Sequence, residues 1–107
     1  MRPFLQTIVA AAFGLHPDVL GEPGRGRADV AFARQVAMYL AYTRFGLSYV
    51  GAGRLFDRDR TTARHGCRQV EESRDDPRID AIVAYLERAL DSCPLVIPMV
   101  AEVRHRG

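Results

Sequence analysis

Three arginines spaced four residues apart are the side chains in this sequence best suited to binding an anion. Arg60, Arg64 and Arg68 follow one another at i, i+4 and i+8, so a helix would carry them on one face. Like charges at this spacing repel, and such a row makes sense where an anion approaches it. DNA phosphates and guanine edges both suit the planar donor fork of arginine. The row therefore indicates a DNA-binding face; the alternative is a face that contacts only solvent.

Hydrogen-bonding side chains are interleaved with this row. Thr61, Thr62 and His65 place short or planar polar groups beside the arginines. Asp59, just before them, is either the N-cap of the helix or an acceptor for a cytosine amino group. Because the first residues of a recognition helix reach base edges, the segment 58–62 is the expected reading element.

Capping residues place this row in a helix-turn-helix. Ser48 caps a short helix, a tight turn through Asp57 follows, and Asp59 caps the arginine helix. Gly51 and Gly53 would destabilise the short helix if exposed, so we expect another backbone to come close to them. The expected helices cover residues 3–13, a single turn at 16–20, 30–45, 49–56, 60–73 and a last helix from 77.

Apolar residues at helical spacing supply the expected core. Asp29 is the expected N-cap of helix 30–45, while Gly14 and Gly46 are the expected stops of the two helices that precede them. No convincing strand pattern occurs before residue 94, so we predict an all-α domain of about five to six helices. The predicted apolar faces are Phe4, Ile8, Ala11 and Ala12; Ala33, Val36, Ala37, Leu40 and Ala41; and Ile79, Ile82, Val83, Leu86 and Leu90.

Length and composition are those of one globular domain. The chain has 107 residues, of which 48% are hydrophobic and 26% charged, with a net charge of +2. All 15 basic residues are arginine, and the stretch 54–68 holds five of them against two aspartates. We divide the chain into a domain, 1–91, and an irregular, apolar, proline-broken tail, 92–107. The tail is expected either to fold over its own core or to form a homodimer interface.

Several functional classes find no support in the sequence. No apolar stretch is long enough to span a membrane and no signal peptide is recognisable, so we expect a cytoplasmic location. His16, His65 and His105 are too scattered to form a metal site, and no nucleophile–base motif indicates an enzyme. Cys67 and Cys93 are expected to be reduced, with Cys67 buried in the core, and a disulfide between them is the open alternative.

The same region resembles the C-terminal DNA-binding domain of the bacterial chromosomal replication initiator (DnaA) family. The resemblance runs from about residue 5 to residue 90, and it rests on segments 33–41 (ARQVAMYLA), 46–48 (GLS) and 56–71 (FDRDRTTARHGCRQVE). The family's pattern in the last segment is similar to F-G-G-R-D-H-T-T-V-x-H-A-C-R-K-I. That pattern is specific, because it combines an N-cap, a double threonine, a helical histidine and a Cys-Arg pair at fixed spacing.

The resemblance implies a domain of about six helices that binds short duplex boxes at replication origins. It implies that residues 58–62 face bases in the major groove, that Arg34 and Gln35 hold phosphates, and that Arg25 or Arg27 enters the minor groove. The predicted DNA-binding residues are Arg25, Arg27, Arg34, Gln35, Ser48, Arg58, Asp59, Arg60, Thr61, Thr62, Arg64, His65 and Arg68.

Three departures from the family pattern bear on function. Arg60 replaces the family's histidine, Arg64 takes an apolar position, and the turn is one residue shorter, with Asp57 near the paired glycines. The nucleotide-binding loop G-x-x-x-x-G-K-[ST] is absent, since the chain has no lysine, so we expect neither nucleotide nor any other cofactor.

Two functions fit these observations. The first is sequence-specific binding of double-stranded DNA by a stand-alone regulator of replication initiation or transcription. The alternative is a protein-interaction module that keeps the fold and has lost specific DNA reading, which the changed residues Asp57 and Arg60 favour.

Overall fold

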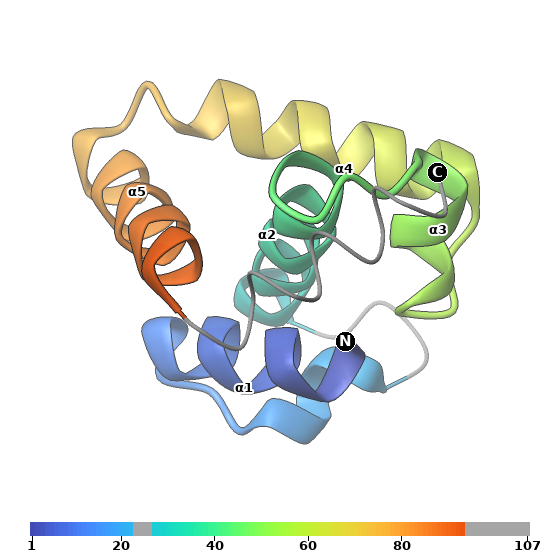
Figure 1. Cartoon of the computed structure of the whole chain (residues 1–107). Coiled ribbons are helices and arrows are strands. Elements are labelled where there is room, and N and C mark those ends of the chain that lie inside the picture. The colour runs from blue at the N-terminus through green and yellow to red at the C-terminus, as the bar shows by residue number, and fades with distance from the viewer. Residues whose placement is uncertain (23–26, 94–107) are drawn as a thin grey trace.

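The computed structural model describes residues 1–22 and 27–93, and the described part is all-helical. Five α-helices and one 3-10 helix follow each other without a strand in these residues (Figure 1). The prediction of an all-α domain is confirmed. The elements are α1 (Arg2–Phe13), η1 (Pro17–Gly21), α2 (Ala28–Thr43), α3 (Tyr49–Arg54), α4 (Arg60–Ser73) and α5 (Pro77–Ser92).

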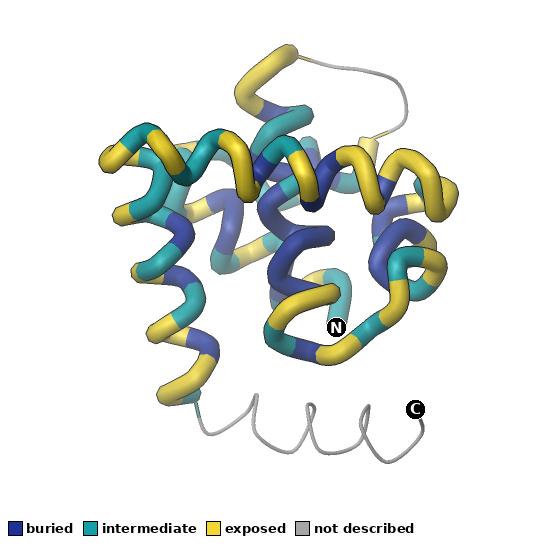
Figure 2. Tube along the Cα trace, turned by 90° about the horizontal axis from the view of Figure 1, so that it is seen from above, coloured by how far each residue is buried: buried dark blue, intermediate teal, exposed yellow. Residues whose placement is uncertain are grey.

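Helix α2 is the centre of the molecule, and every other described element except α5 packs closely against it. It contacts α1, η1, α3 and α4, and nearly all of its residues from 33 to 41 are buried (Figure 2). The predicted alanine-rich stripe is confirmed, but the buried surface is wider than a stripe, because Met38 and Tyr39 are buried as well. A helix buried on most sides fixes the position of every element that touches it.

Two details of the apolar pattern and the caps differ from expectation. Leu5 and Val9 fill the core under α1, while Ala11 is exposed, so the apolar face is turned from the predicted one. The N-cap of α2 is Arg27 rather than Asp29, because the extended backbone lies at Arg27 and Asp29 is already in the first helical turn. There its carboxylate pairs with Arg27 at 3.2 Å.

Helix ends are otherwise close to the prediction. Gly14 takes the left-handed conformation at φ 68° and ends α1. Gly46 does so at φ 72°, but α2 already ends at Thr43 rather than Phe45, and the chain turns through the residues between them. Helix α3 likewise ends at Arg54, two residues earlier than expected.

Helix α5 is held to the rest of the domain by apolar and ionic contacts. Its face is the predicted one, with Val83, Leu86 and Leu90 buried and the two isoleucines half-buried. Glu87 of α5 forms an ion pair with Arg74 of the α4–α5 turn at 3.0 Å and another with Arg44 at the end of α2 at 3.3 Å. Glu87 is only 13% exposed, so this ion pair is better shielded from solvent than a typical surface pair.

The tail and part of the basic loop fall outside the described residues. Arg25 lies in the undescribed segment 23–26, and the expected tail lies almost wholly in 94–107. The division at residue 91 and the homodimer interface therefore remain expectations from the sequence. Within the described ranges, no helix is long and apolar enough to cross a membrane, and no cluster of histidine, cysteine, aspartate or glutamate suits a metal ion.

Gly53 meets backbone and Gly51 does not, which separates the two glycines of α3. A Cβ on Gly53 would lie 2.6 Å from the carbonyl oxygen of Arg58 and 2.8 Å from that of Asp59. A Cβ on Gly51 would meet nothing nearer than the Ser48 Oγ, at 3.5 Å. The expected close approach is thus confirmed for Gly53 and wrong for Gly51.

This difference gives a matched pair of substitutions. We expect Gly53→Ala to destabilise the domain by about 1–3 kcal/mol, because backbone must move to admit the methyl group. Gly51→Ala should be neutral or stabilise by up to about 1 kcal/mol through helix propensity. Urea unfolding followed by circular dichroism measures both. Equal effects of the two substitutions would contradict the close contact.

The buried thiol of α4 makes stability depend on alkaline pH. Burial, followed by the nearby Glu71 carboxylate, raises the pKa of Cys67 from 9.0 to about 11. The folded state therefore holds this proton more tightly than the unfolded state does. The resulting stability is fully present below pH 9 and is lost as the pH rises to about 11.

Thermal unfolding across this pH range tests the effect. The wild-type chain should lose on the order of 2 kcal/mol more between these limits than Cys67→Ala, in which that thiol is missing. Tyr39, whose pKa is raised to about 12 chiefly by burial, contributes equally to both proteins and cancels in the comparison. Parallel pH profiles of the two proteins would contradict the buried, protonated thiol.

Candidate nucleic-acid interface

Helices α3 and α4 and the turn between them form the expected helix-turn-helix. Ser48 Oγ accepts a hydrogen bond from the Gly51 amide at 3.1 Å and caps α3. Asp59 Oδ1 accepts one from the Thr62 amide at 2.7 Å and caps α4. This bond also holds the pKa of Asp59 below its usual value, so the carboxylate stays charged at the helix start. Capping by both residues is confirmed; their contact with DNA remains a prediction.

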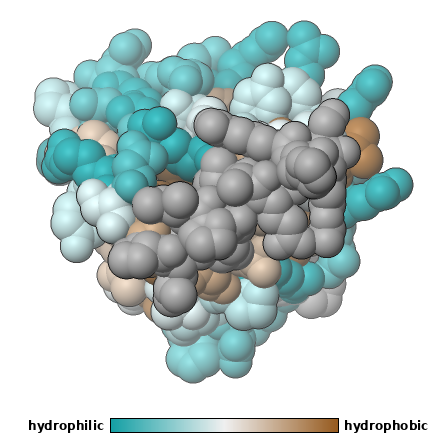
Figure 3. All heavy atoms as spheres, in the orientation of Figure 1, coloured by the Kyte–Doolittle hydropathy of each residue, from teal (hydrophilic) through white to brown (hydrophobic). Residues whose placement is uncertain are grey.

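Helix α4 divides sharply into a buried and an exposed face. The buried face is made of small residues and one valine, and it packs against α2 and α3. The exposed face carries the arginine row and its polar neighbours, and this edge of the molecule is hydrophilic (Figure 3). A shallow pocket of about 290 Å³ lies directly on it. The residues that line this pocket are Thr61, Arg64, His65 and Arg68.

A larger pocket on one flank of α4 holds two guanidinium groups, and we call it the α2-side pocket. It has a volume of about 600 Å³ and is lined by Ala31, Arg34, Gln35, Met38, Arg58, Thr62 and His65. The structure thus brings together five of the predicted residues from α2, the turn and α4. The Arg58 guanidinium donates through Nη1 to the Phe56 carbonyl at 2.8 Å and through Nη2 to the Glu22 carbonyl at 3.4 Å, which holds this group beside the turn.

The resemblance implies that Arg34 holds a phosphate, and the structure places this side chain largely in the interior. It is only 5% exposed, and its Nε donates to the Leu20 carbonyl at 2.8 Å. Burial is the largest cause that lowers the pKa of Arg34, and the positive charge of Arg58 lowers this pKa further. Arg34 therefore ties η1 to α2 as well as lining the pocket, and an anion there would relieve its repulsion with Arg58.

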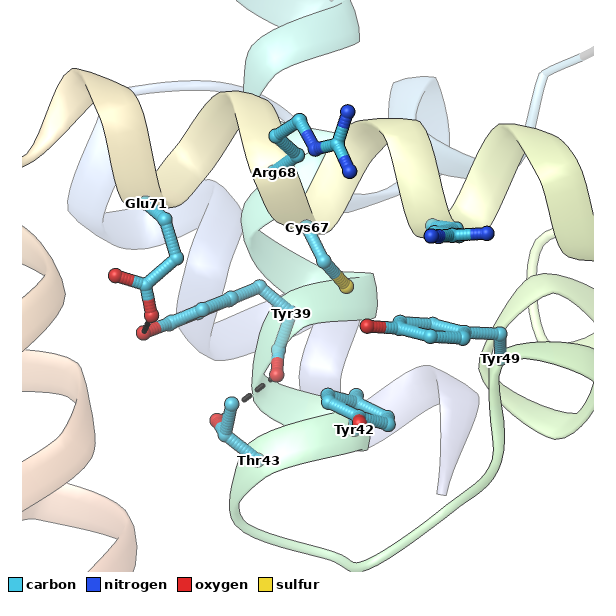
Figure 4. A pocket seen from close by; sticks show the side chains of 8 residues that line it. Tyr39, Tyr42, Thr43, Tyr49, Cys67, Arg68 and Glu71 are labelled. Atoms are coloured by element: carbon cyan, nitrogen blue, oxygen red, sulfur yellow. Dashed lines mark hydrogen bonds between the residues drawn. The ribbon is translucent and has the colours of Figure 1, made fainter.

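A second pocket lies on the opposite flank of α4, and it was not foreseen from the sequence. We call it the tyrosine pocket; its volume is about 360 Å³ (Figure 4). Tyr42 and Tyr49 stack with ring centroids 4.3 Å apart and an interplanar angle of 12°. A hydrogen bond with Tyr42 is the main cause that raises the pKa of Tyr49. The lining residues are Tyr39, Tyr42, Thr43, Tyr49, Arg64, Cys67, Arg68 and Glu71.

The signal for this pocket was present but incomplete in the sequence. Tyr42 lies near the end of α2 and Tyr49 at the start of α3, on either side of the turn at Gly46. Only the tertiary course of that turn brings the two rings together. Both rings lie beneath Cys67 and Arg68 of α4 in Figure 4, so this flank combines aromatic surface with positive charge.

The basic loop before α2 contributes one described residue. Arg27 is exposed and occupies the N-cap position of α2 without a capping hydrogen bond, and its side chain pairs with the nearby aspartate. Its predicted contact with a minor groove stays a prediction. Arg25, its alternative, lies outside the described residues.

Known proteins with the same pattern of residues identify the family. Residues 4–70 match the family described as bacterial dnaA protein helix-turn-helix. Over 63 residues the chain is 48% identical to the chromosomal replication initiator protein DnaA of Thermomicrobium roseum, a match that covers 57% of this chain and 13% of that protein.

Two further DnaA proteins match over more of the chain. The protein of Sphingopyxis alaskensis is 41% identical over 90 residues, and that of Acholeplasma laidlawii is 33% identical over 91 residues. Each match covers 82% of this chain and 20% of the relative, so the chain spans about a fifth of their length. The family pattern covers more than half of the chain, including the two caps and the turn described above, and the chain therefore belongs to the bacterial DnaA helix-turn-helix family.

Proposed function

We propose that this chain binds double-stranded DNA sequence-specifically, with α4 in the major groove, and regulates replication initiation or transcription. The observation that carries the proposal is the exposed face of α4, where Arg60, Arg64 and Arg68 alternate with polar side chains. A major groove is about 12 Å wide and admits one α-helix. The proposed role is binding, so it requires no catalytic group, nucleotide or metal.

We propose that the two flanking pockets face the two phosphate backbones that border a major groove. Thr62 and His65 line the α2-side pocket, whereas Arg64 and Cys67 line the tyrosine pocket, so the two lie on opposite sides of the exposed face. A helix inserted in the groove has one DNA strand on each side. Arg34 and Arg58 of the α2-side pocket would then neutralise a phosphate on one strand. Arg68 and the hydroxyls of the tyrosine pocket would bind a phosphate on the other strand.

Base reading falls to the start of α4 under this proposal. Arg60, Thr61 and Thr62 form its first turn and are all exposed. Arginine can donate two hydrogen bonds to guanine, which histidine at the same place cannot do in the same way. We therefore propose that this chain prefers a guanine at the base that faces Arg60, the position where the family pattern has histidine. Such a role places the chain in the cytoplasm, at the nucleoid.

In-vitro selection followed by fluorescence anisotropy tests the proposal. The selected duplex and a shuffled duplex should differ in affinity for the wild-type chain, and Arg60→Ala should lose about 1–3 kcal/mol on the selected duplex only. Arg68→Ala should weaken both duplexes alike and reduce the salt slope by about one unit. Arg88→Ala removes the same charge from the exposed face of α5 and should change neither the affinity for duplex nor the salt slope.

Arg34 is not a suitable variant for this test, since its loss would also release the contact with η1. The absence of binding to any duplex at low salt would overturn the proposal. In that case the chain would be a protein-interaction module that keeps the helix-turn-helix fold.

A further inference from the structure

The turn between α3 and α4 holds a carboxylate in a strained backbone position. Asp57 has φ 58°, and it is the only residue other than glycine with positive φ among those the structure describes. Aspartate tolerates this region better than most residues but still at a cost relative to glycine. The turn is tight, because the Arg58 amide donates to the Gly53 carbonyl at 2.8 Å just beyond it.

Arg2, at the start of α1, reaches this carboxylate from a distant part of the sequence. Its Nη1 lies 3.3 Å from Asp57 Oδ2, and its Nη2 donates to the Gly21 carbonyl at 3.3 Å. The guanidinium also lies over the ring of Phe56, 5.7 Å from its centroid, and Phe56 is fully buried. One side chain thus joins α1, the end of η1 and the turn.

The charge of Asp57 is unfavourable for binding an anion. Asp57 directly precedes Arg58, which lines the α2-side pocket with Arg34. A negative charge within about 10 Å of a phosphate is only partly screened at ordinary ionic strength. The positive charge of Arg2 lies directly beside the Asp57 carboxylate and offsets its negative charge. Arg2 is half-buried, and its contacts with Gly21 and Phe56 restrain its geometry.

We propose that Arg2 is a positioning residue for DNA binding. It holds Asp57 in the left-handed turn and compensates its charge, so that α4 starts at a fixed place beside the α2-side pocket. The Arg2–Asp57 contact stabilises a left-handed conformation that glycine would adopt without such help. It also links α1 to the proposed DNA interface. This role rests on the proposed function, because it concerns the same interface.

A double-mutant cycle tests the coupling. Arg2→Ala should weaken binding of the selected duplex about two- to fivefold, as for the loss of one restrained surface ion pair. Asp57→Gly should bind at least as tightly as the wild type, since it removes both the strain and the negative charge. In the Asp57→Gly background, Arg2→Ala should have no more than a small further effect.

Two additional measurements separate positioning from a general loss of structure. Arg2→Lys keeps the positive charge and should restore most of the affinity, and the effect of Arg2→Ala should shrink as salt rises. Thermal unfolding of the wild type, Arg2→Ala, Asp57→Gly and the double variant, measured without DNA, should also show coupling between Arg2 and Asp57. Arg88→Ala serves as the control that loses an equal charge and should show no coupling with Asp57→Gly.

The outcomes distinguish this role from the proposed function. If the wild type binds duplex but Arg2→Ala weakens binding equally in both backgrounds, the positioning role is overturned and DNA binding stands. Additive melting temperatures in the cycle would also overturn it. If the wild type binds no duplex, the proposed function and this role fail together.

Discussion

The close approach of the Gly53 backbone to the carbonyls of Arg58 and Asp59 is the constraint on which the arrangement of the site depends. No side chain larger than hydrogen fits between α3 and the segment that starts α4. This contact folds the turn back onto α3 and brings Asp59 to the point where it caps α4. The direction of α4, and with it the direction of its arginine row, follows from a contact between main chains.

A second close approach sets the depth at which α4 lies on the core. A Cβ on Gly66 would lie 3.1 Å from the Gln35 side chain of α2, so α4 can rest directly on the central helix. Small residues on its inner face allow this packing, and the outer face is left free for polar and charged groups. The two requirements do not compete, because the helical period keeps them on opposite sides of α4. Helix α4 is therefore supported on its inner face, and Glu71 adds a hydrogen bond from the Tyr39 hydroxyl of α2 at 2.6 Å, while the arginine row is left exposed.

Local signals in the sequence were sufficient for some features of the fold. Ser48 and Asp59 cap the helices they were expected to cap, and α4 begins and ends where its pattern predicts. These features depend on residues within one or two turns of each other, and a cap is a contact between near neighbours. The family resemblance rests on the same local pattern.

Features made by distant residues were missed or misplaced. The cap at Asp29 was wrong, because a good capping residue only caps where the preceding loop leaves it extended. The burial of Arg34 depends on where η1 docks, and the stacking of Tyr42 on Tyr49 depends on the course of an intervening turn. The contact of Arg2 with Asp57 joins two ends of the fold. None of these has a periodic or short-range signature, so sequence spacing could not reveal them.

We propose that the exposed face of α4 and its two flanking pockets together bind one DNA duplex. Amide chemical-shift mapping by NMR, with the selected duplex added to the full chain, tests this most directly. We expect the largest shifts on residues 58–68, on the start of α2 and around Tyr42 and Tyr49, while α5 should change little. Shifts concentrated on the outer face of α5, with α4 unaffected, would contradict it.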